Sequence, residues 1–205
     1  MSGIVGQNTL DNSGLIKAPA GGGAWNFIAK QTASTSADIS FTSGIDSTYK
    51  EYIFTFNNIH AGTNRASLTF NVSIDSGSNY NVAKTTTDFV GFHYEDDSSG
   101  SLYYGAGEDL AEGTGGQLII GYLTDDNDSS GSGMLHLFDP SSVVFVKHFM
   151  ATCQNHGETG GGDDYSYNAY TAGYANTTSA VDAVQFKMNS GNIDAGDICL
   201  YGITT

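Results

Sequence analysis

Apolar and polar side chains alternate residue by residue along much of this chain, and that period of two is the strongest constraint on its fold. The clearest run extends from Ala66 to Asp75, where every second residue is apolar. Neighbouring side chains of a β-strand point to opposite sides, so such a run places one side of a strand in a core. It predicts an amphipathic strand, with an apolar side of Leu68, Phe70, Val72 and Ile74 and a polar side of Ser67, Thr69, Asn71 and Ser73.

The C-terminal stretch, Ser179 to Thr205, contains two further strand patterns. Residues 184–188 alternate in the same way, whereas residues 198–201 are apolar on both sides. A strand that is apolar on both sides is typical of a sheet covered on both faces. We interpret these segments as a strand pair at the centre of a β-sandwich, separated by the turn at residues 189–192, with earlier strands pairing onto them.

Similar short runs, bounded by Gly, Asn, Asp and Ser, recur through the rest of the chain. We expect strands at residues 25–31, 37–42, 51–56, 89–94, 101–104, 117–123, 134–138, 143–152 and 165–175. No stretch shows a sustained helical period, and short strands separated by frequent turn signals are typical of sandwiches and barrels. The predicted fold is all-β: an antiparallel β-sandwich formed by a single domain at residues 24–205.

Residues 1–23 precede the first strand pattern and have a different composition, with six glycines, one proline and few large side chains. Such a segment buries too little apolar area to fold by itself. Its apolar residues are nevertheless spaced along it, which favours an extended N-terminal arm that docks onto another surface or a neighbouring subunit. The alternative is a tail without order. The expected anchors of the arm are Ile4, Val5, Leu10, Leu15 and Ile16.

The net charge of −15 limits the partners that the protein can have. Direct nucleic-acid binding relies on Lys and Arg to neutralise phosphate, so we expect no nucleic-acid partner. No run approaches the roughly 20 apolar residues of a membrane span, so we expect no membrane partner. Half of the acidic residues lie between Lys84 and Lys147, where there is no Lys or Arg. We interpret this region as a solvated acidic face; a cation-dependent or partner-facing surface is the alternative.

Motifs that would indicate an enzyme, a metal or a cofactor are missing from the sequence. Residues 126–131 echo the start of a calcium-binding loop, but Leu137 stands where the closing Glu is needed. The five histidines lack metal-site spacing, and there is no nucleophile elbow or phosphate-binding loop. We therefore expect no catalytic residues, no metal and no cofactor. Cys153 and Cys199 are expected to be buried free thiols, as in a protein assembled in a reducing cytoplasm.

A tyrosine-rich segment beside the glycine-rich residues 157–162 is the best candidate for a recognition surface. Exposed tyrosines stack on sugar rings or anchor protein interfaces. The alternative is that these side chains pack within the sandwich or within an oligomer. The candidate residues are Tyr165, Tyr167, Tyr170 and Tyr174, together with Tyr201 in the last strand.

Three segments, KEYIFTFNNIHAGTNRASLTFNVSIDSGSNYN, FVKHFMAT and AGYANTTSAVDAVQFKMNSGNIDAGDICLYGI, resemble a group of small virion proteins of tailed bacteriophages, especially marine and cyanobacterial ones. The similarity spans about residues 25–203, and the N-terminal MSGIVG also looks like the start of such proteins. The resemblance implies a structural protein of the particle with a jelly-roll-like sandwich. It carries over no enzymatic residues and leaves open whether the location is capsid or tail.

These observations together predict a virion protein, assembled in the host cytoplasm, that forms a homotrimer and attaches through its N-terminal arm. Its partners would be other virion proteins, the major capsid protein or tail proteins. Capsid decoration, or cementing, is the favoured role, because one domain with one arm suits a subunit added to a shell. The alternative is a tail-fibre or receptor-binding module that recognises a host surface glycan. A glycan-degrading enzyme is disfavoured, because no carboxylate pair can be placed across a cleft.

Overall fold

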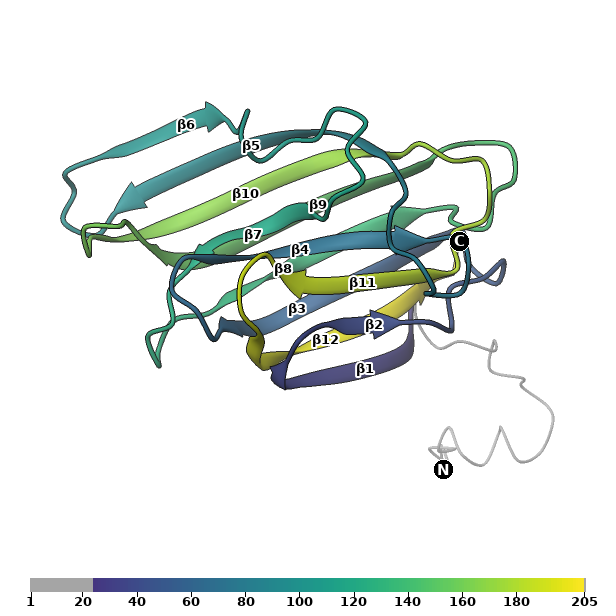
Figure 1. The fold of residues 1–205 in the computed structure, drawn as a ribbon, viewed down its shortest axis with the longest axis horizontal. Helices are drawn as coiled ribbons and strands as arrows, with labels where there is room; N and C mark the ends of the chain where they lie inside the picture. Colours follow the sequence, from purple (N-terminus) through teal and green to yellow (C-terminus); the bar gives the residue numbers. More distant parts are fainter. Residues whose placement is uncertain (1–23, 205) are drawn as a thin grey trace, which may run out of the picture.

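The computed structural model describes residues 24–204 and consists of antiparallel β-strands in two layers (Figure 1). The prediction of an all-β antiparallel sandwich is confirmed, since the described residues contain twelve antiparallel strands and no helix. Accordingly, no helix in this part of the chain is long and apolar enough to cross a membrane. The expected arm anchors Ile4, Val5, Leu10, Leu15 and Ile16 lie outside the described residues.

The two layers differ in size. In spatial order, the large sheet contains β1 (Trp25–Ser36), β12 (Ile193–Ile203), β3 (Glu51–Ala61), β8 (Gly131–Phe138), β9 (Lys147–Glu158), β10 (Asp164–Ala175), β5 (Lys84–Tyr94) and β6 (Gly100–Tyr104). The small sheet contains β7 (Gln117–Leu123), β4 (Ala66–Ser73), β11 (Ala183–Met188) and β2 (Ile39–Phe41). A single pairing, Leu123 with Gly157, joins the sheets. The large sheet thus extends past the small one through β10, β5 and β6 (Figure 1).

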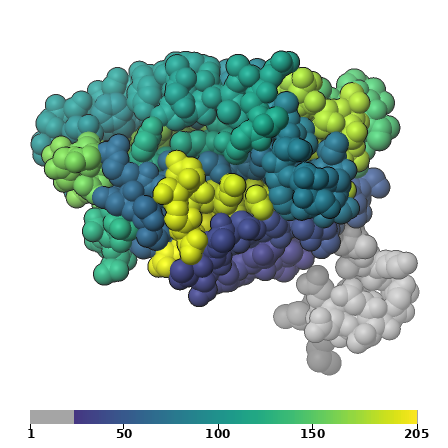
Figure 2. Space-filling view, in the orientation of Figure 1, coloured from purple at the N-terminus to yellow at the C-terminus, as the bar shows by residue number. Residues whose placement is uncertain are grey.

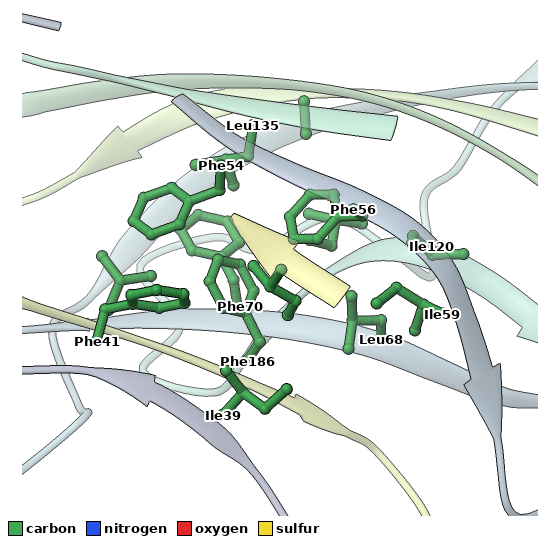
Figure 3. Packing of buried hydrophobic residues seen from close by; sticks show 14 of the residues in the cluster. Ile39, Phe41, Phe54, Phe56, Ile59, Leu68, Phe70, Ile120, Leu135 and Phe186 are labelled. Carbon is green, nitrogen blue, oxygen red and sulfur yellow. The ribbon is translucent and has the colours of Figure 1, made fainter. Parts of the chain in front are cut away.

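Aromatic side chains fill the core between the sheets (Figure 3). Phe54 and Phe56 of β3 meet Phe186 of β11 edge to face, with ring centroids 5.1 and 5.2 Å apart. Phe70 of β4 meets Phe149 of β9 at 4.7 Å in the same geometry. Each such pair contributes about 0.5–1.5 kcal/mol beyond its area burial. The alternating apolar positions of strands far apart in sequence therefore hold the two layers together.

The two C-terminal strands do not form the expected pair. β11 lies in the small sheet between β4 and β2, whereas β12 lies in the large sheet between β1 and β3. Each is an interior strand, as predicted, but the turn at residues 189–192 carries the chain from one layer to the other. The alternating pattern specifies which side of a strand is buried and does not specify the strand beside it.

Two strands extend beyond their predicted ends. β3 continues through residues 57–61, where Asn57 pairs with Asp197, and β9 continues through Glu158 along β10. Backbone pairing with a long neighbour stabilises these polar residues as strand despite their low intrinsic preference for it. Conversely, residues 143–146 belong to the β8–β9 loop and not to the strand predicted there.

The polar side of β4 is buried, although the sequence suggested a strand with only its apolar side in a core. All eight of its residues are buried. The Ser67 hydroxyl accepts a hydrogen bond from the Tyr122 backbone N–H at 3.0 Å, and the Asn71 side chain donates to the Tyr80 and Thr114 carbonyls. The connecting segments thus cover this side and satisfy its polar groups. Figure 2 shows teal chain from the middle of the sequence on this side of the molecule.

Candidate functional site: an aromatic pocket and an apolar sheet face

Strand β10 divides the predicted tyrosines between the two faces of the large sheet. Tyr165 and Tyr167 share the inner face, as expected of a regular strand, and are buried. Tyr170, which is 50% exposed, and Tyr174 lie on the outer face. Tyr201 of β12 also lies on the outer face. The candidate tyrosines therefore do not share one face of the sheet, because alternate residues of a strand point to opposite sides.

The inner face forms a pocket of about 240 Å³ where the large sheet extends beyond the small one. Cross-strand register brings Tyr94 opposite Tyr165 and Phe92 opposite Tyr167. The Tyr94 and Tyr165 ring centroids are 5.6 Å apart. The pocket is lined by Arg65, Phe92, Tyr94, Tyr103, Tyr122, Thr159, Tyr165 and Tyr167.

Most phenols of the pocket are strongly held in their neutral form. Burial raises the pKa of Tyr165 to about 12 and raises the pKa of Tyr167 further. Burial also raises the pKa of Tyr122, whose hydroxyl donates to Glu108 Oε1 at 2.7 Å. These tyrosines therefore offer hydroxyl donors and no negative charge near neutral pH.

The hydroxyl of Tyr167 is a buried polar group without a hydrogen-bond partner among the described residues. Only 2% of the residue is exposed. The Tyr103 hydroxyl interacts with it and contributes to the shift of its pKa, although no hydrogen bond of ordinary geometry joins the two. Buried hydroxyls normally have a partner, so a small movement of the pocket lining, either of Tyr103 or around a bound molecule, would satisfy this one.

Arg65, the single arginine of the sequence, stands at the same pocket. Its guanidinium carbon lies 5.6 Å from the ring centroid of Tyr122, within the range of a cation–π contact. It forms no ion pair within residues 24–204, although the chain has 22 acidic residues. The nearby carboxylates are engaged otherwise: Glu158 accepts from Asn64, and Glu108 accepts from Tyr122.

Beneath the pocket, on β5, lies a buried carboxyl group that was not anticipated. Asp88 is fully buried, and its Oδ1 accepts a hydrogen bond from the Thr171 hydroxyl. Its Oδ2 has no partner among the described residues. Burial raises its pKa to about 6, and the charges of Glu108 and Asp109 add to the shift. The expectation of a solvated acidic face is therefore wrong for this member of the acidic region. No three His, Cys, Asp or Glu residues of the described chain are placed to hold a metal.

Apolar side chains are exposed across the outer face of the large sheet, which we define as the side of its strands turned away from the small sheet. The register aligns Met134, Thr152, Tyr170, Phe89 and Tyr104 in one row across five strands. All five are exposed. The apolar pattern of residues 198–201 is explained here, because Ile198 and Leu200 point into the core while Cys199 and Tyr201 point to this face.

A second row of the outer face includes Phe27, Tyr201, Ile53 and His136, and ends at Met150 on β9. Phe27 is 61% exposed and Met150 is 57% exposed. Such a face is unusual, because exposed apolar residues on a soluble domain are normally scattered singly. The rows together cross the whole large sheet and place exposed Phe27, Met134, Met150, Tyr170 and Phe89 on its outer face, interrupted by polar residues and the buried Ile53.

Two carboxylates of the outer face have side-chain partners, one near its middle and one at its β1 edge. Glu51 contacts the His136 imidazole at 2.6 Å, and Asp197 forms an ion pair with Lys30 at 2.8 Å. For a chain with a net charge of −15, this face is a surface on which two copies could meet without bringing unpaired carboxylates together. A smaller apolar tip, formed by Val143, Val144 and Phe145, is exposed on the β8–β9 loop.

Both cysteines are buried and free, as predicted. The sequence identified two residues of the pocket, Tyr165 and Tyr167, and missed the other lining residues. Phe92 and Tyr94 could have been identified from the sequence, because they are two residues apart on one predicted strand and so point to the same side.

No family model matches the sequence, and no curated protein matches it significantly.

Proposed function

We propose that the protein is a structural protein of a tailed-bacteriophage virion, a capsid decoration or cement protein that assembles as a homotrimer. The observation that carries this proposal is the outer face of the large sheet, which is apolar, exposed and free of unpaired carboxylates at its middle. Protein interfaces combine an apolar centre with depletion of charge, and this face has both properties. The resemblance of the sequence to small virion proteins is the reason for placing the protein on a phage particle.

The apolar rows provide the driving force for association in this proposal. Fully burying a large apolar side chain contributes roughly 1.5–3 kcal/mol. Phe27, Met150 and Tyr170 are about half exposed, so burying their remaining surface at an interface would contribute part of that energy. Electrostatics opposes self-association, because every subunit carries a charge of −15. Contact through a face whose carboxylates Glu51 and Asp197 have partners lessens that repulsion, which favours this face over the acidic loops.

The N-terminal segment is assigned to attachment. Trp25, the first residue of β1, lies beside Tyr201 at the edge of the outer face, with ring centroids 5.4 Å apart. Residues 1–23 therefore join the domain next to the proposed interface. Their apolar residues would dock on another virion protein, with several arms of a trimer acting together.

Two measurements test these roles. Met150→Glu places a charge in the centre of the apolar face and should convert trimers to monomers in light scattering at micromolar concentration, because an unpaired carboxylate would be buried. Ser78→Glu adds the same charge to an exposed loop and should leave the trimer intact. A monomeric wild type, or a Met150→Glu variant that remains trimeric, would refute the assembly proposal.

For attachment, residues 1–23 are deleted, and binding is measured to particles that lack the protein. We expect unchanged unfolding of the domain and lost occupancy on the particle. Full occupancy of the truncated form would refute the role of the arm and assign the contact to the domain.

The second candidate function is a tail-fibre or receptor-binding module that recognises a host surface glycan. The aromatic pocket with its unpartnered Tyr167 hydroxyl favours it. Location separates the two candidates: a reconstruction of the intact particle with the protein on the capsid shell supports decoration, and one with it on the tail supports receptor binding.

A further inference from the structure

We infer that the aromatic pocket binds one acidic sugar residue, with the sugar ring against the tyrosines and the sugar carboxylate on Arg65. The inference names the class of ligand for the second candidate function. The biological role of this binding rests on that proposed function. Binding itself is a property of the described domain. It can therefore be tested without a particle, and separately from trimer formation on the opposite face.

The size of the pocket suits a single sugar ring. Its volume of about 240 Å³ is below the 300 to 1,000 Å³ typical of sites for drug-sized ligands. Its walls are aromatic: Phe92 lies 5.5 Å from Tyr94 and 6.1 Å from Tyr103, and Tyr122 lies 5.7 Å from Tyr167, between ring centroids. Aromatic faces pack well against the C–H faces of a pyranose, and phenols add polar groups at their rims.

The Tyr167 hydroxyl indicates that the ligand carries hydroxyl groups. It is buried, lies in the wall of the pocket beside the Tyr103 hydroxyl, and makes no hydrogen bond of ordinary geometry in residues 24–204. Burial holds it in its protonated form, so it can donate to a ligand oxygen or accept from a ligand hydroxyl. A purely apolar ligand would leave this group unsatisfied, whereas a sugar would supply its partner.

Arg65 selects a sugar with a carboxylate. It is the one arginine of the chain, it pairs with no carboxylate of the described residues, and it is held over the Tyr122 ring. A guanidinium binds a carboxylate through two parallel hydrogen bonds, which lysine cannot reproduce.

The acidic character of the protein does not preclude such a ligand. Charges in solution are screened over a length of about 10 Å at 0.1 M salt, so distant carboxylates contribute little at the pocket. Two carboxylates whose charges act on the pocket tyrosines accept hydrogen bonds from neutral groups: Glu108 from the Tyr122 hydroxyl and Glu158 from the Asn64 amide. The guanidinium is the one cationic group of the pocket lining, and two parallel hydrogen bonds from it to a ligand carboxylate have to outweigh the repulsion from these two side chains.

The test is a titration of the full-length protein, followed by saturation-transfer NMR, with methyl glucuronide and with methyl glucoside, which differ in the carboxylate. The glucuronide should bind, and the glucoside should bind about tenfold to a hundredfold more weakly, as expected for hydrogen bonds to a charged group. Arg65→Gln should reduce glucuronide affinity to the glucoside level, whereas Lys50→Gln, at an exposed lysine, should not.

Tyr167→Phe removes only the unpartnered hydroxyl and should weaken binding severalfold without lowering the melting temperature. Tyr170→Phe, on the same strand and the outer face, is the matched control and should bind normally. Three results would overturn the inference: no binding of the glucuronide, equal binding of both sugars, or binding unaffected by Arg65→Gln and Tyr167→Phe. Each of these would leave particle attachment and trimer formation untouched, so failure here is distinguishable from failure of the proposed structural role.

Discussion

Replacing Asp88 with Asn should stabilise the protein at neutral pH and remove part of its pH dependence. The Asp88 carboxyl is fully buried, with one oxygen bound by the Thr171 hydroxyl and the other without a partner in the described structure. Asparagine has the same shape and keeps an acceptor for Thr171, but it carries no charge. The substitution therefore removes the cost of burying a carboxylate and retains its one hydrogen bond.

The magnitude follows from the shift of the pKa. Burial raises the pKa of Asp88 from 3.8 to about 6, so the folded protein holds this proton more tightly than the unfolded chain does. The resulting stabilisation is fully present below pH 3.8 and is lost as the pH rises to about 6. One pKa unit corresponds to 1.36 kcal/mol, so the loss at pH 7 is about 3 kcal/mol. A chain of this size changes its melting temperature by roughly 2–4 °C per kcal/mol, which predicts a gain of several degrees for Asp88→Asn.

The assay is thermal unfolding between pH 4 and pH 8, followed by circular dichroism, for the wild type, Asp88→Asn and the exposed control Asp128→Asn. The advantage of Asp88→Asn should be largest at pH 7 and should shrink toward pH 4, where the wild-type carboxyl is protonated. The control should follow the wild type throughout. A lower melting temperature for Asp88→Asn at pH 7, or an advantage that stays constant down to pH 4, would refute the reasoning.

Three further changes test the packing of the domain. Burial lowers the pKa of Lys84 to about 8, so wild-type stability should rise between pH 8 and pH 10.5, and Lys84→Met should lose that rise in urea unfolding. Gly133→Ala would put a methyl group 2.5 Å from the Thr152 carbonyl oxygen and should cost about 1–3 kcal/mol, whereas Gly91→Ala, with open space around it, should change little. Tyr167→Phe should leave the calorimetric melting temperature equal or higher, because the lost hydroxyl has no partner; a clear decrease would mean that it has one.

Much of the fold could be predicted because alternation is a local property. The run at residues 66–75 specifies a strand whatever lies beside it, and the same holds for residues 184–188. Burial of the polar side of β4 could not be predicted in this way. It depends on segments from elsewhere in the chain that supply partners for Ser67 and Asn71, among them the Tyr122 amide and the Thr114 carbonyl.

The pocket was only partly predictable for a similar reason. Tyr165 and Tyr167 stand out within one tyrosine-rich strand, but their companions come from β5, β6, β7 and the turn at Arg65. Their meeting depends on the register of β10 with β5, in which a slip of one residue would move every side chain to the other face. No local pattern records that register.

Strand β10 shows why the two proposed activities can coexist without interfering. Its odd-numbered residues Tyr165 and Tyr167 line the pocket, while its even-numbered residues Tyr170 and Tyr174 lie on the apolar outer face. Ligand and subunit would therefore approach opposite sides of one sheet, and neither would cover the other. Because the strand is held by neighbours on both edges, its side chains cannot exchange faces. A trimer formed through the outer face would thus keep its pockets open, and their number would raise the avidity for a surface that displays many copies of the sugar.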